Sequence, residues 1–345
     1  MGACWRSLAS NPMVKLKVFA LNARPNAPFQ DDVFYGLDFE VLDWNADSNT
    51  QIVENYLIET GVDVVVVPGW ASKQYMKLVF SKSLRHIKFV LAMDTPWTGS
   101  VRQLLATIKL RSYTKRMARA VVSGERAYQY ARRLGFAKNA IRNGLYGIDG
   151  KSLEGCLARR EEKGWPRAFF YAGRFEEIKG IRVLLDAYAR YRQKCCDPWP
   201  LIACGTGPLS HLAQGVEGVD YRGFVQPSSL PHIIASAGVF VLASTYDPWP
   251  LVLVEACAAG LPVIHTDACG SSVELVRPYF NGVSVATGDA ISLSGGMKWC
   301  HDNASLLPLM GSRSGALAEA YHAENWSTRW YEWLLELTSD EIATL

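Results

Sequence analysis

The sequence lacks several features that would each have indicated a class of protein. It has no run of about 18 apolar residues, so we expect no membrane-spanning helix. Its eight cysteines lack the paired spacing of zinc sites, which favours reduced thiols. A dinucleotide fingerprint would need a third glycine at position 210, where Ser210 stands. The apolar run Val18 to Leu21 is too short for a signal-peptide core, so we expect no export and a cytoplasmic protein.

Acidic residues are scarce in one stretch. Between Val101 and Arg142, eleven lysines and arginines accompany a single acid, Glu125. The positive electrostatic potential of such a stretch favours an anionic partner. No other feature of this stretch indicates nucleic acid, which we do not expect as a partner.

The length and the distribution of apolar runs indicate the fold. At 345 residues the chain is longer than a domain with a single hydrophobic core usually is. At about 150 residues per domain, this length predicts two domains. Apolar, β-branched runs such as "VDVVVVPG", "IKFVLAM" and "GVFVLAS" alternate with helix-length segments. Continuous apolar strands imply parallel sheets covered on both faces. We therefore predict an α/β fold of two Rossmann-like, doubly wound domains, residues 1–150 and 151–325, with the break in a glycine-rich segment.

Two cations follow a predicted strand of the second half. Arg174 follows Gly173 at the strand end, and Lys179 precedes Gly180, where a helix begins. Ligands of doubly wound domains bind at the carboxyl ends of the strands, and a phosphate at a helix N-terminus would suit these cations. Alternatively, Arg174 and Lys179 pair with the neighbouring acids, Glu176 and Glu177.

Two further segments carry chemistry at predicted strand ends. In "ACGTGPLSHLA", Gly205 and Gly207 either let a ligand approach the backbone or form a tight turn. In "STYDPWPLVLVEACAAGLPVI", Asp247 and Glu255 stand in an otherwise apolar run. An unpaired buried carboxylate costs several kcal/mol, so these acids indicate a solvated edge or a ligand, and Glu255 could also be an acid at a helix N-terminus.

In combination these motifs resemble the retaining, nucleotide-sugar-dependent glycosyltransferases of GT-B architecture, in particular glycosyltransferase family 4. The segment from Gly173 to Gly180 resembles the family's G-R-x4-K-G motif, and "CGTGPL" resembles its G-x-G-P-L turn. Asp247 and Glu255 have the spacing of its E-x7-E motif, and "ACGSSVELV" and "NGVSVATGD" resemble its later motifs. The likeness extends from about residue 167 to 289 and is diffuse before that.

The resemblance implies an architecture and an activity. The two domains would face each other across a cleft that holds a UDP- or GDP-sugar, and residues 326–345 would form a helix that crosses back onto the first domain. The first domain would bind the acceptor. The enzyme would be a retaining hexosyltransferase of cell-envelope glycan biosynthesis, acting on a lipid-linked or glycan acceptor. It would need no cofactor and no metal, since no D-x-D pair stands where a metal site is expected.

The resemblance also implies roles for single residues. Arg174 and Lys179 would stabilise the leaving diphosphate, Asp247 would contact the donor sugar, and Glu255 would accept hydrogen bonds from ribose hydroxyls. The implied donor-binding residues are Gly173, Gly205, Gly207, Phe224, Val225, Pro248, Trp249, Pro250, Leu251 and Glu255.

The sequence departs from the family pattern at three places. Asp247 stands where glutamate is usual. The glycine-rich loop after the first strand is missing from "LNARPNAPFQDD", which leaves Arg24 as a candidate phosphate or acceptor contact. A histidine is common after the fourth strand, but Asp94 stands there; it either acts at the reaction centre or caps a turn before Pro96.

The basic stretch also has an apolar component, "SVRQLLATIKLRSYTKRMARAV". A solvated basic helix is one interpretation. Because the stretch lies in the acceptor-binding half of the family, peripheral binding to anionic lipid on the inner face of the membrane, or to a polyprenyl-phosphate acceptor, is the other. The residues assigned to this role are Lys109, Arg111, Lys115 and Arg116.

Two other functions remain open at this point. A GT-B protein that has lost catalysis would bind the sugar nucleotide without turning it over, and the altered position 247 and missing histidine fit that alternative. A sugar-nucleotide epimerase shares the architecture, but the paired motifs described above are those of the transferases.

Overall fold

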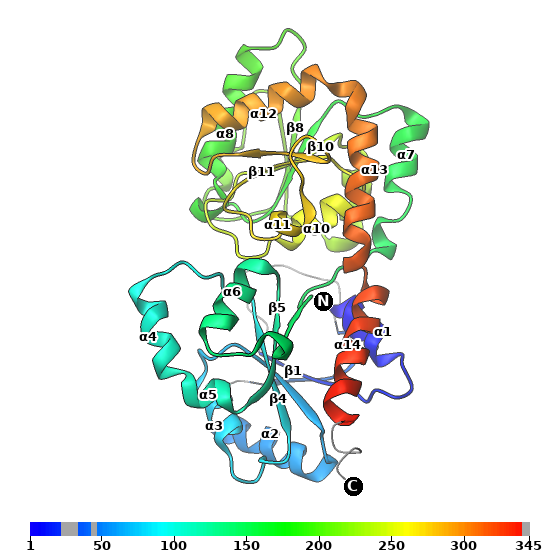
Figure 1. The fold of residues 1–345 in the computed structure, drawn as a ribbon. Helices are drawn as coiled ribbons and strands as arrows, with labels where there is room; N and C mark the ends of the chain where they lie inside the picture. Colours follow the sequence, from blue (N-terminus) through cyan, green and yellow to red (C-terminus); the bar gives the residue numbers. More distant parts are fainter. Residues whose placement is uncertain (22–33, 43–46, 340–345) are drawn as a thin grey trace. The chain divides into compact units, whose positions relative to one another are not determined.

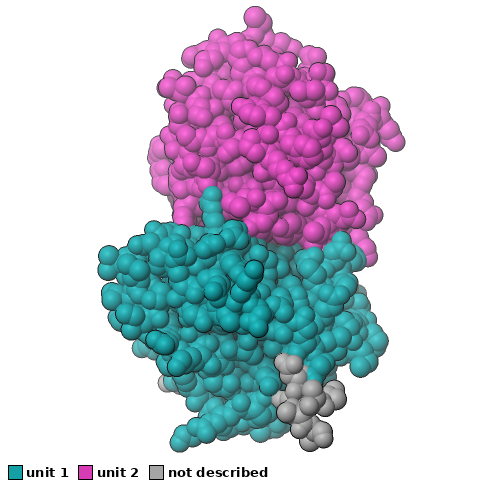
Figure 2. All heavy atoms as spheres, viewed as in Figure 1, with its two compact units in different colours: residues 1–27, 32–147, 323–345 teal, residues 28–31, 148–322 magenta. Residues whose placement is uncertain are grey.

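The computed structural model describes residues 1–21, 34–42 and 47–339. The described chain divides into two compact units, coloured separately in Figure 2. Unit 1 contains the described residues up to Gly147 together with those from Ala323 onward. Unit 2 contains Ile148 to His322.

Unit 1 is built on parallel strands (Figure 1). A four-stranded sheet has the order β3-β4-β5-β6, formed by Val64–Pro68, Lys88–Met93, Met117–Val122 and Ile141–Asn143. A separate parallel pair joins β1 (Lys17–Leu21) and β2 (Asp38–Leu42). The α-helices described in this unit are α1 (Gly2–Ala9), α2 (Asp47–Thr60), α3 (Lys73–Phe80), α4 (Val101–Lys109), α5 (Arg111–Lys115), α6 (Glu125–Arg133) and α14 (Ala323–Ser339).

The long C-terminal helix α14 returns to unit 1 after the chain has passed through unit 2. Its buried indoles fix it there, because Trp326 donates through Nε1 to the Leu145 carbonyl at 3.0 Å and Trp330 donates to the Gly144 carbonyl at 3.2 Å. Helix α14 also packs against α1, whose buried Cys4 and Leu8 belong to the same hydrophobic cluster as the two indoles (Figure 1). The predicted crossing back of the C-terminal helix is confirmed, and the helix begins at Ala323.

Unit 2 has one six-stranded parallel sheet of order β12-β11-β10-β7-β8-β9. In chain order its strands are β7 (Phe169–Ala172), β8 (Leu201–Cys204), β9 (Val219–Gly223), β10 (Val239–Leu242), β11 (Val263–Thr266) and β12 (Gly282–Val285). Its α-helices are α7 (Cys156–Lys163), α8 (Ile181–Gln193), α9 (Leu230–Ala235), α10 (Leu251–Ala258), α11 (Ser272–Leu275), α12 (Ala290–Asp302) and α13 (Leu307–Ala318).

The strands of unit 2 form as the apolar runs predict. All residues of β7, β8, β10 and β11 are buried, as expected for parallel strands covered on both faces. Helices α8 and α12 pack against each other, as do α10 and α13 (Figure 1). The predicted α/β fold with parallel sheets in two Rossmann-like units is confirmed.

Short 3₁₀ turns complete the described secondary structure. They are η1 (Lys138–Ala140), η2 (Lys151–Leu153), η3 (Glu177–Lys179), η4 (Ser210–Leu212), η5 (Pro227–Ser229), η6 (Ala304–Leu306) and η7 (Glu319–Tyr321). The entry and exit of unit 2 lie side by side, because Ile148 forms a parallel bridge with His322 and its N–H donates to the Tyr321 carbonyl at 2.9 Å.

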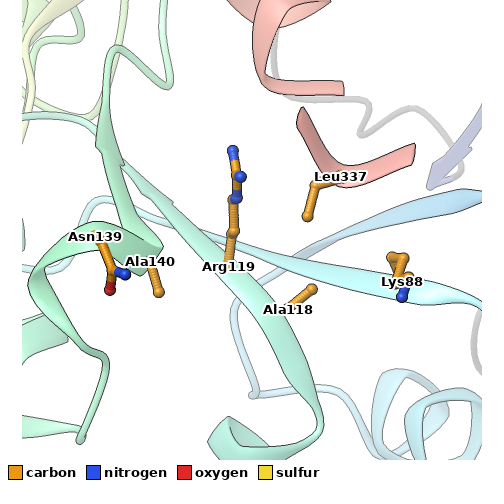
Figure 3. Close-up of a pocket in the computed structure, with 6 residues that line it drawn as sticks. All are labelled: Lys88, Ala118, Arg119, Asn139, Ala140 and Leu337. Carbon is orange, nitrogen blue, oxygen red and sulfur yellow. The ribbon is translucent and has the colours of Figure 1, made fainter. Parts of the chain in front are cut away.

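Unit 1 contains a pocket that is lined by none of the predicted site residues (Figure 3). It has a volume of about 230 Å³ and is lined by Lys88, Ala118, Arg119, Asn139, Ala140 and Leu337. Lys88 begins β4, so the pocket lies at the opposite end of that strand from Asp94. Arg119 is already paired there with Glu336 on α14, at 2.5 Å. We assign no ligand to this pocket. Among the described residues, no helix is long and apolar enough to cross a membrane.

Candidate functional site

The predicted motifs of unit 2 lie at the carboxyl ends of neighbouring strands. Strands β11, β10, β7 and β8 are consecutive in the sheet, and a segment singled out from the sequence follows each of them. Because parallel strands end at one edge of a sheet, these loops lie side by side. The interactions between them define the candidate site.

Lys179 and Asp247 form the central contact of the site. The Lys179 ammonium lies 2.6 Å from Asp247 Oδ2, and the Ser244 hydroxyl lies 3.5 Å from the same oxygen. Asp247 is 7% exposed, so a carboxylate without a partner would be costly there. Lys179 supplies that partner and still has two N–H donors for an anionic ligand. The predicted residues from two separate motifs are therefore brought together.

Gly180 fixes the position of Lys179. Its φ of +68° is left-handed, and a Cβ at this position would lie 1.9 Å from the Ala243 carbonyl oxygen at the end of β10. The Thr245 N–H donates to the Ile178 carbonyl at 2.9 Å and ties the same two loops together. Only glycine allows the turn η3 to approach β10 this closely.

Arg174 is more exposed than Lys179. Its guanidinium pairs with Glu176, and its side chain is 71% exposed. Its carbonyl accepts a hydrogen bond from the Tyr171 hydroxyl at 2.9 Å. Burial raises the pKa of Tyr171, with smaller contributions from nearby acids, so the phenol remains a donor. The sequence places Tyr171 beside this motif but predicts no role for it, and the structure shows that it belongs to β7.

The alternative pairing of both cations with neighbouring acids is correct for one of them. Arg174 does pair with Glu176. Glu177, however, pairs with Arg182 at 2.8 Å, and Lys179 reaches across to Asp247.

Gly205 and Gly207 allow a close approach, and in this structure the partner is the neighbouring loop. A Cβ at Gly205 would lie 1.8 Å from the Gly173 carbonyl oxygen, and one at Gly207 would lie 2.4 Å from the Phe175 carbonyl oxygen. The Phe175 N–H also donates to the Thr206 carbonyl at 2.9 Å. These glycines lock the loops after β7 and β8 together, and donor contact by them remains a prediction.

The segment from Asp247 to Leu251 is held by the loop after β11. The Gly270 N–H donates to the Asp247 carbonyl at 2.8 Å, and the Ser271 hydroxyl donates to the Pro250 carbonyl at 3.1 Å. A Cβ at Gly270 would lie 1.7 Å from the Pro248 carbonyl oxygen. The buried Trp249 packs near Tyr321, with ring centroids 6.0 Å apart. These contacts fix the backbone of this loop against the loop after β11.

Glu255 lies in the second turn of α10, so the helix N-terminus does not explain it. Burial raises its pKa to about 7, and the charge of Asp149 contributes in the same direction. A carboxyl group with a pKa of about 7 is present in both its protonated and its ionised form near neutral pH. Phe224 and Val225, the remaining predicted donor residues, follow β9 and are half-buried.

In unit 1, Asp94 directly follows β4 and accepts a hydrogen bond from the Tyr146 hydroxyl at 3.0 Å. Burial, with a smaller contribution from Asp94, raises the pKa of Tyr146, which therefore stays protonated as the donor. A role for Asp94 in the reaction remains a prediction. Arg24 lies outside the described residues.

The four basic residues assigned to an acceptor or membrane surface do not share one environment. Lys109, Arg111 and Lys115 are exposed on α4 and α5. Arg116 instead donates to the Leu84 carbonyl at 2.7 Å, and its guanidinium carbon lies 5.1 Å from the centroid of the Phe89 ring. Arg116 thus has a packing role, because its guanidinium satisfies a backbone carbonyl.

Among residues 1–21, 34–42 and 47–339, no three His, Cys, Asp or Glu side chains gather as a metal site would require. Independence from a metal remains a prediction.

Comparisons with known proteins place this site in context. Residues 158–311 match the family model described as Glycosyl transferases group 1. The chain is 30% identical over 209 residues to a D-inositol 3-phosphate glycosyltransferase of Salinispora tropica, which covers 54% of this chain and 41% of the relative. It is 27% identical over 138 residues to an uncharacterized glycosyltransferase of Methanocaldococcus jannaschii, covering 38% and 35% respectively. The matched segments thus span less than half of either relative's length.

Solved structures match nearly the whole chain. A sucrose-phosphate synthase from Thermosynechococcus elongatus has a TM-score of 0.78 at 17% identity, covering 98% of this chain and 92% of its own. Anabaena HepE in complex with UDP has a TM-score of 0.75 at 18% identity, covering 97% and 96%. At these identities the likeness establishes the fold, which is the predicted GT-B arrangement of two Rossmann-like domains.

Proposed function

Since residues 158–311 contain a Glycosyl transferases group 1 domain and the fold is GT-B, we propose that this chain is a glycosyltransferase that moves a hexose from a nucleotide-sugar to an acceptor. The observation that carries the proposal is the pairing of Lys179 with Asp247 at 2.6 Å. It joins a cation suited to phosphate and an acid suited to sugar hydroxyls at one strand-end edge.

The donor is a UDP- or GDP-sugar. Support comes from solved structures of this fold that contain UDP, UDP with glucose, and UDP-glucose. Glu255 is the residue we assign to the ribose, because a carboxylate can accept hydrogen bonds from both hydroxyls of a diol. Gly173, Gly205, Gly207, Phe224, Val225 and the segment from Pro248 to Leu251 complete the proposed donor site.

The proposed chemistry depends on where negative charge develops. As the glycosidic bond breaks, the leaving diphosphate gains charge, and fixed cations at that position lower the barrier. Lys179 is held in place by Gly180 and Asp247, and Arg174 lies at the end of β7, the strand beside β10. The second oxygen of Asp247 remains for a donor-sugar hydroxyl. We propose retention of configuration, with the departing phosphate oxygen taking the acceptor proton, and no metal.

We propose a lipid-linked or glycan acceptor and a place in family 4, in cell-envelope glycan synthesis. Support comes from the names of two relatives. One is an O-antigen chain mannosyltransferase B of Escherichia coli, 32% identical over 119 residues. The other is a lipopolysaccharide 1,6-galactosyltransferase of Salmonella typhimurium, 25% identical over 170 residues.

A donor panel tests the proposed function. The purified chain is heated with UDP-glucose, UDP-galactose, UDP-N-acetylglucosamine or GDP-mannose, and a bound donor at about 100 times its Kd should stabilise it by about 2.7 kcal/mol. Slow hydrolysis of that donor without acceptor is expected of a transferase. Stabilisation without turnover would favour the catalytically inactive binding protein, and formation of an isomeric sugar-nucleotide would favour the epimerase. No stabilisation by any donor would contradict the proposal.

The pKa of Glu255 predicts how donor affinity depends on pH. Its raised pKa means that the free protein holds this carboxyl partly protonated at neutral pH. If the ribose hydroxyls donate to the carboxylate, binding releases the proton, so affinity should rise with pH. With a pKa of about 7, the gain from about pH 6 to about pH 8 is up to about tenfold. Calorimetry with a diphosphate sugar suits this test, because such a donor itself does not titrate in that range.

The variant Glu255→Gln separates this effect from other titrations. It should bind the donor more weakly at high pH and show a flat profile. A sloping profile that survives in Glu255→Gln would assign the titration to another group and remove Glu255 from the ribose.

A further inference from the structure

Helix α4 of unit 1 exposes its apolar side to solvent. Val101, Leu104, Leu105 and Ile108 are 72%, 52%, 49% and 74% exposed. Their spacing places all four on one face of the helix. A surface helix of a globular protein normally turns such a stripe toward the core, so α4 has the reverse orientation.

The polar side of α4 is the side that is anchored. Gln103 is buried, and its Nε2 donates to the Pro96 carbonyl at 2.8 Å. Its Oε1 accepts from the Thr98 N–H at 2.7 Å and from the Thr98 hydroxyl at 3.0 Å. Ser100 caps the helix by accepting from the Gln103 N–H at 3.4 Å. These bonds fix the rotation of α4 and hold the apolar stripe outward.

The surroundings of the stripe are cationic. The sequence contains no aspartate or glutamate from Thr95 to Gly124. Four exposed cations lie on α4 and on α5, which follows it directly (Figure 1): Arg102, Lys109, Arg111 and Lys115. An apolar stripe accompanied by unopposed cations complements a surface that is both anionic and apolar beneath.

We propose that α4 and α5 form a membrane-binding surface whose occupant is a bilayer containing anionic lipid. The four aliphatic side chains enter the boundary between headgroups and acyl chains, and the cations meet the lipid phosphates. The inference goes beyond the proposed function, because donor binding and bond cleavage are assigned to unit 2 and need no membrane.

Two features favour a bilayer over a protein partner. A symmetric dimer through this face would bring two like-charged surfaces together, which is unfavourable. Protein interfaces are also enriched in aromatic anchors, whereas the exposed stripe is entirely aliphatic. A bilayer accepts aliphatic side chains without requiring a matching shape.

Co-sedimentation with vesicles tests the proposal. The full chain should bind vesicles of phosphatidylcholine with phosphatidylglycerol at low salt, bind them less at high salt, and bind phosphatidylcholine alone much more weakly. The variant L104S/L105S/I108S should lower partitioning at least about tenfold, since it removes the apolar insertion. The variant K109Q/R111Q/K115Q should lower it by on the order of a hundredfold at low salt.

Matched controls lie elsewhere in unit 1. Ile52 and Ile58 on α2 are each 47% exposed, and Lys82 and Arg85 are exposed before β4. The variants I52S/I58S and K82Q/R85Q should bind vesicles like the unaltered chain. All four variants change side chains at the surface, so each should keep a cooperative thermal transition and the unaltered stabilisation by donor.

Several results would overturn the proposal. One is a chain that stays in the supernatant with anionic vesicles at low salt. Others are equal binding to neutral vesicles, or α4 variants that bind like the controls. Self-association without vesicles that L104S/L105S/I108S abolishes would assign the stripe to a second copy of the chain instead. Because vesicle binding is measured without donor, failure here leaves the glycosyltransferase proposal standing.

Discussion

Replacing Lys179 with alanine should lower turnover of the nucleotide-sugar by on the order of a thousandfold. Removing one preorganised group at a developing charge costs about a hundredfold to a thousandfold in kcat. Here the loss is at the upper end, because Asp247 is 7% exposed and loses the partner that lies 2.6 Å away. Its uncompensated negative charge would then lie beside the proposed diphosphate site. The measurement is kcat for donor hydrolysis at saturating donor.

Arg174→Ala should lose less, about a hundredfold, since that side chain is 71% exposed and already paired with Glu176. The matched control is Arg182→Ala. Arg182 lies close to Lys179 in the sequence, but it forms an exposed ion pair with Glu177 at 2.8 Å. Its removal should therefore change kcat less than twofold. If Lys179→Ala remained within about fivefold of the unaltered chain, Lys179 would have no place in the mechanism.

Gly180→Ala should destabilise unit 2 by roughly 2 to 5 kcal/mol. The left-handed φ of +68° costs about 1 to 2 kcal/mol for any residue with a Cβ. Overpacking adds about 1 to 3 kcal/mol, because the new carbon would meet the Ala243 carbonyl oxygen at 1.9 Å and push η3 away from β10. The free energy of unfolding in urea measures the sum. Donor-induced stabilisation should also fall, since Lys179 moves with η3.

Gly215→Ala isolates the steric part of that cost. Gly215 has nearly the same φ, +70°, but nothing lies within 4 Å of where its Cβ would be. It should lose only the conformational part, about 1 to 2 kcal/mol. Equal losses in the two variants would mean that close packing against Ala243 contributes nothing.

The fold could be predicted because its signal is local. Runs such as "RAFFYAG" and "GVFVLAS" contain four or more consecutive hydrophobic residues, and such runs bury both faces of a parallel strand. Strand β2 was not predicted because it lacks this local signal. Its sequence, "DFEVL", carries polar residues and most of its side chains are not buried, so nothing in it indicates a core strand.

The site was predictable in its residues but not in its pairings. Lys179 and Asp247 are 68 positions apart, and they meet because β10 lies beside β7 in the sheet. Strand order is set by packing of the whole unit, which spacing along the chain does not encode. The same limit applies to Arg116, whose partner carbonyl at Leu84 is 32 positions away. A charge count cannot distinguish a cation bound to backbone from one free to meet a ligand.

The return of α14 to unit 1 has a consequence for how the protein is made. The carbonyls of Leu145 and Gly144 accept hydrogen bonds from the indoles of Trp326 and Trp330, respectively. The ribosome adds these tryptophans about 180 residues later. Unit 2 is one continuous stretch between them, so it can complete its fold while unit 1 still lacks a helix. The N-terminal part would therefore be finished last, and until then the surface that α14 will cover is open to chaperones and to misassembly with other chains.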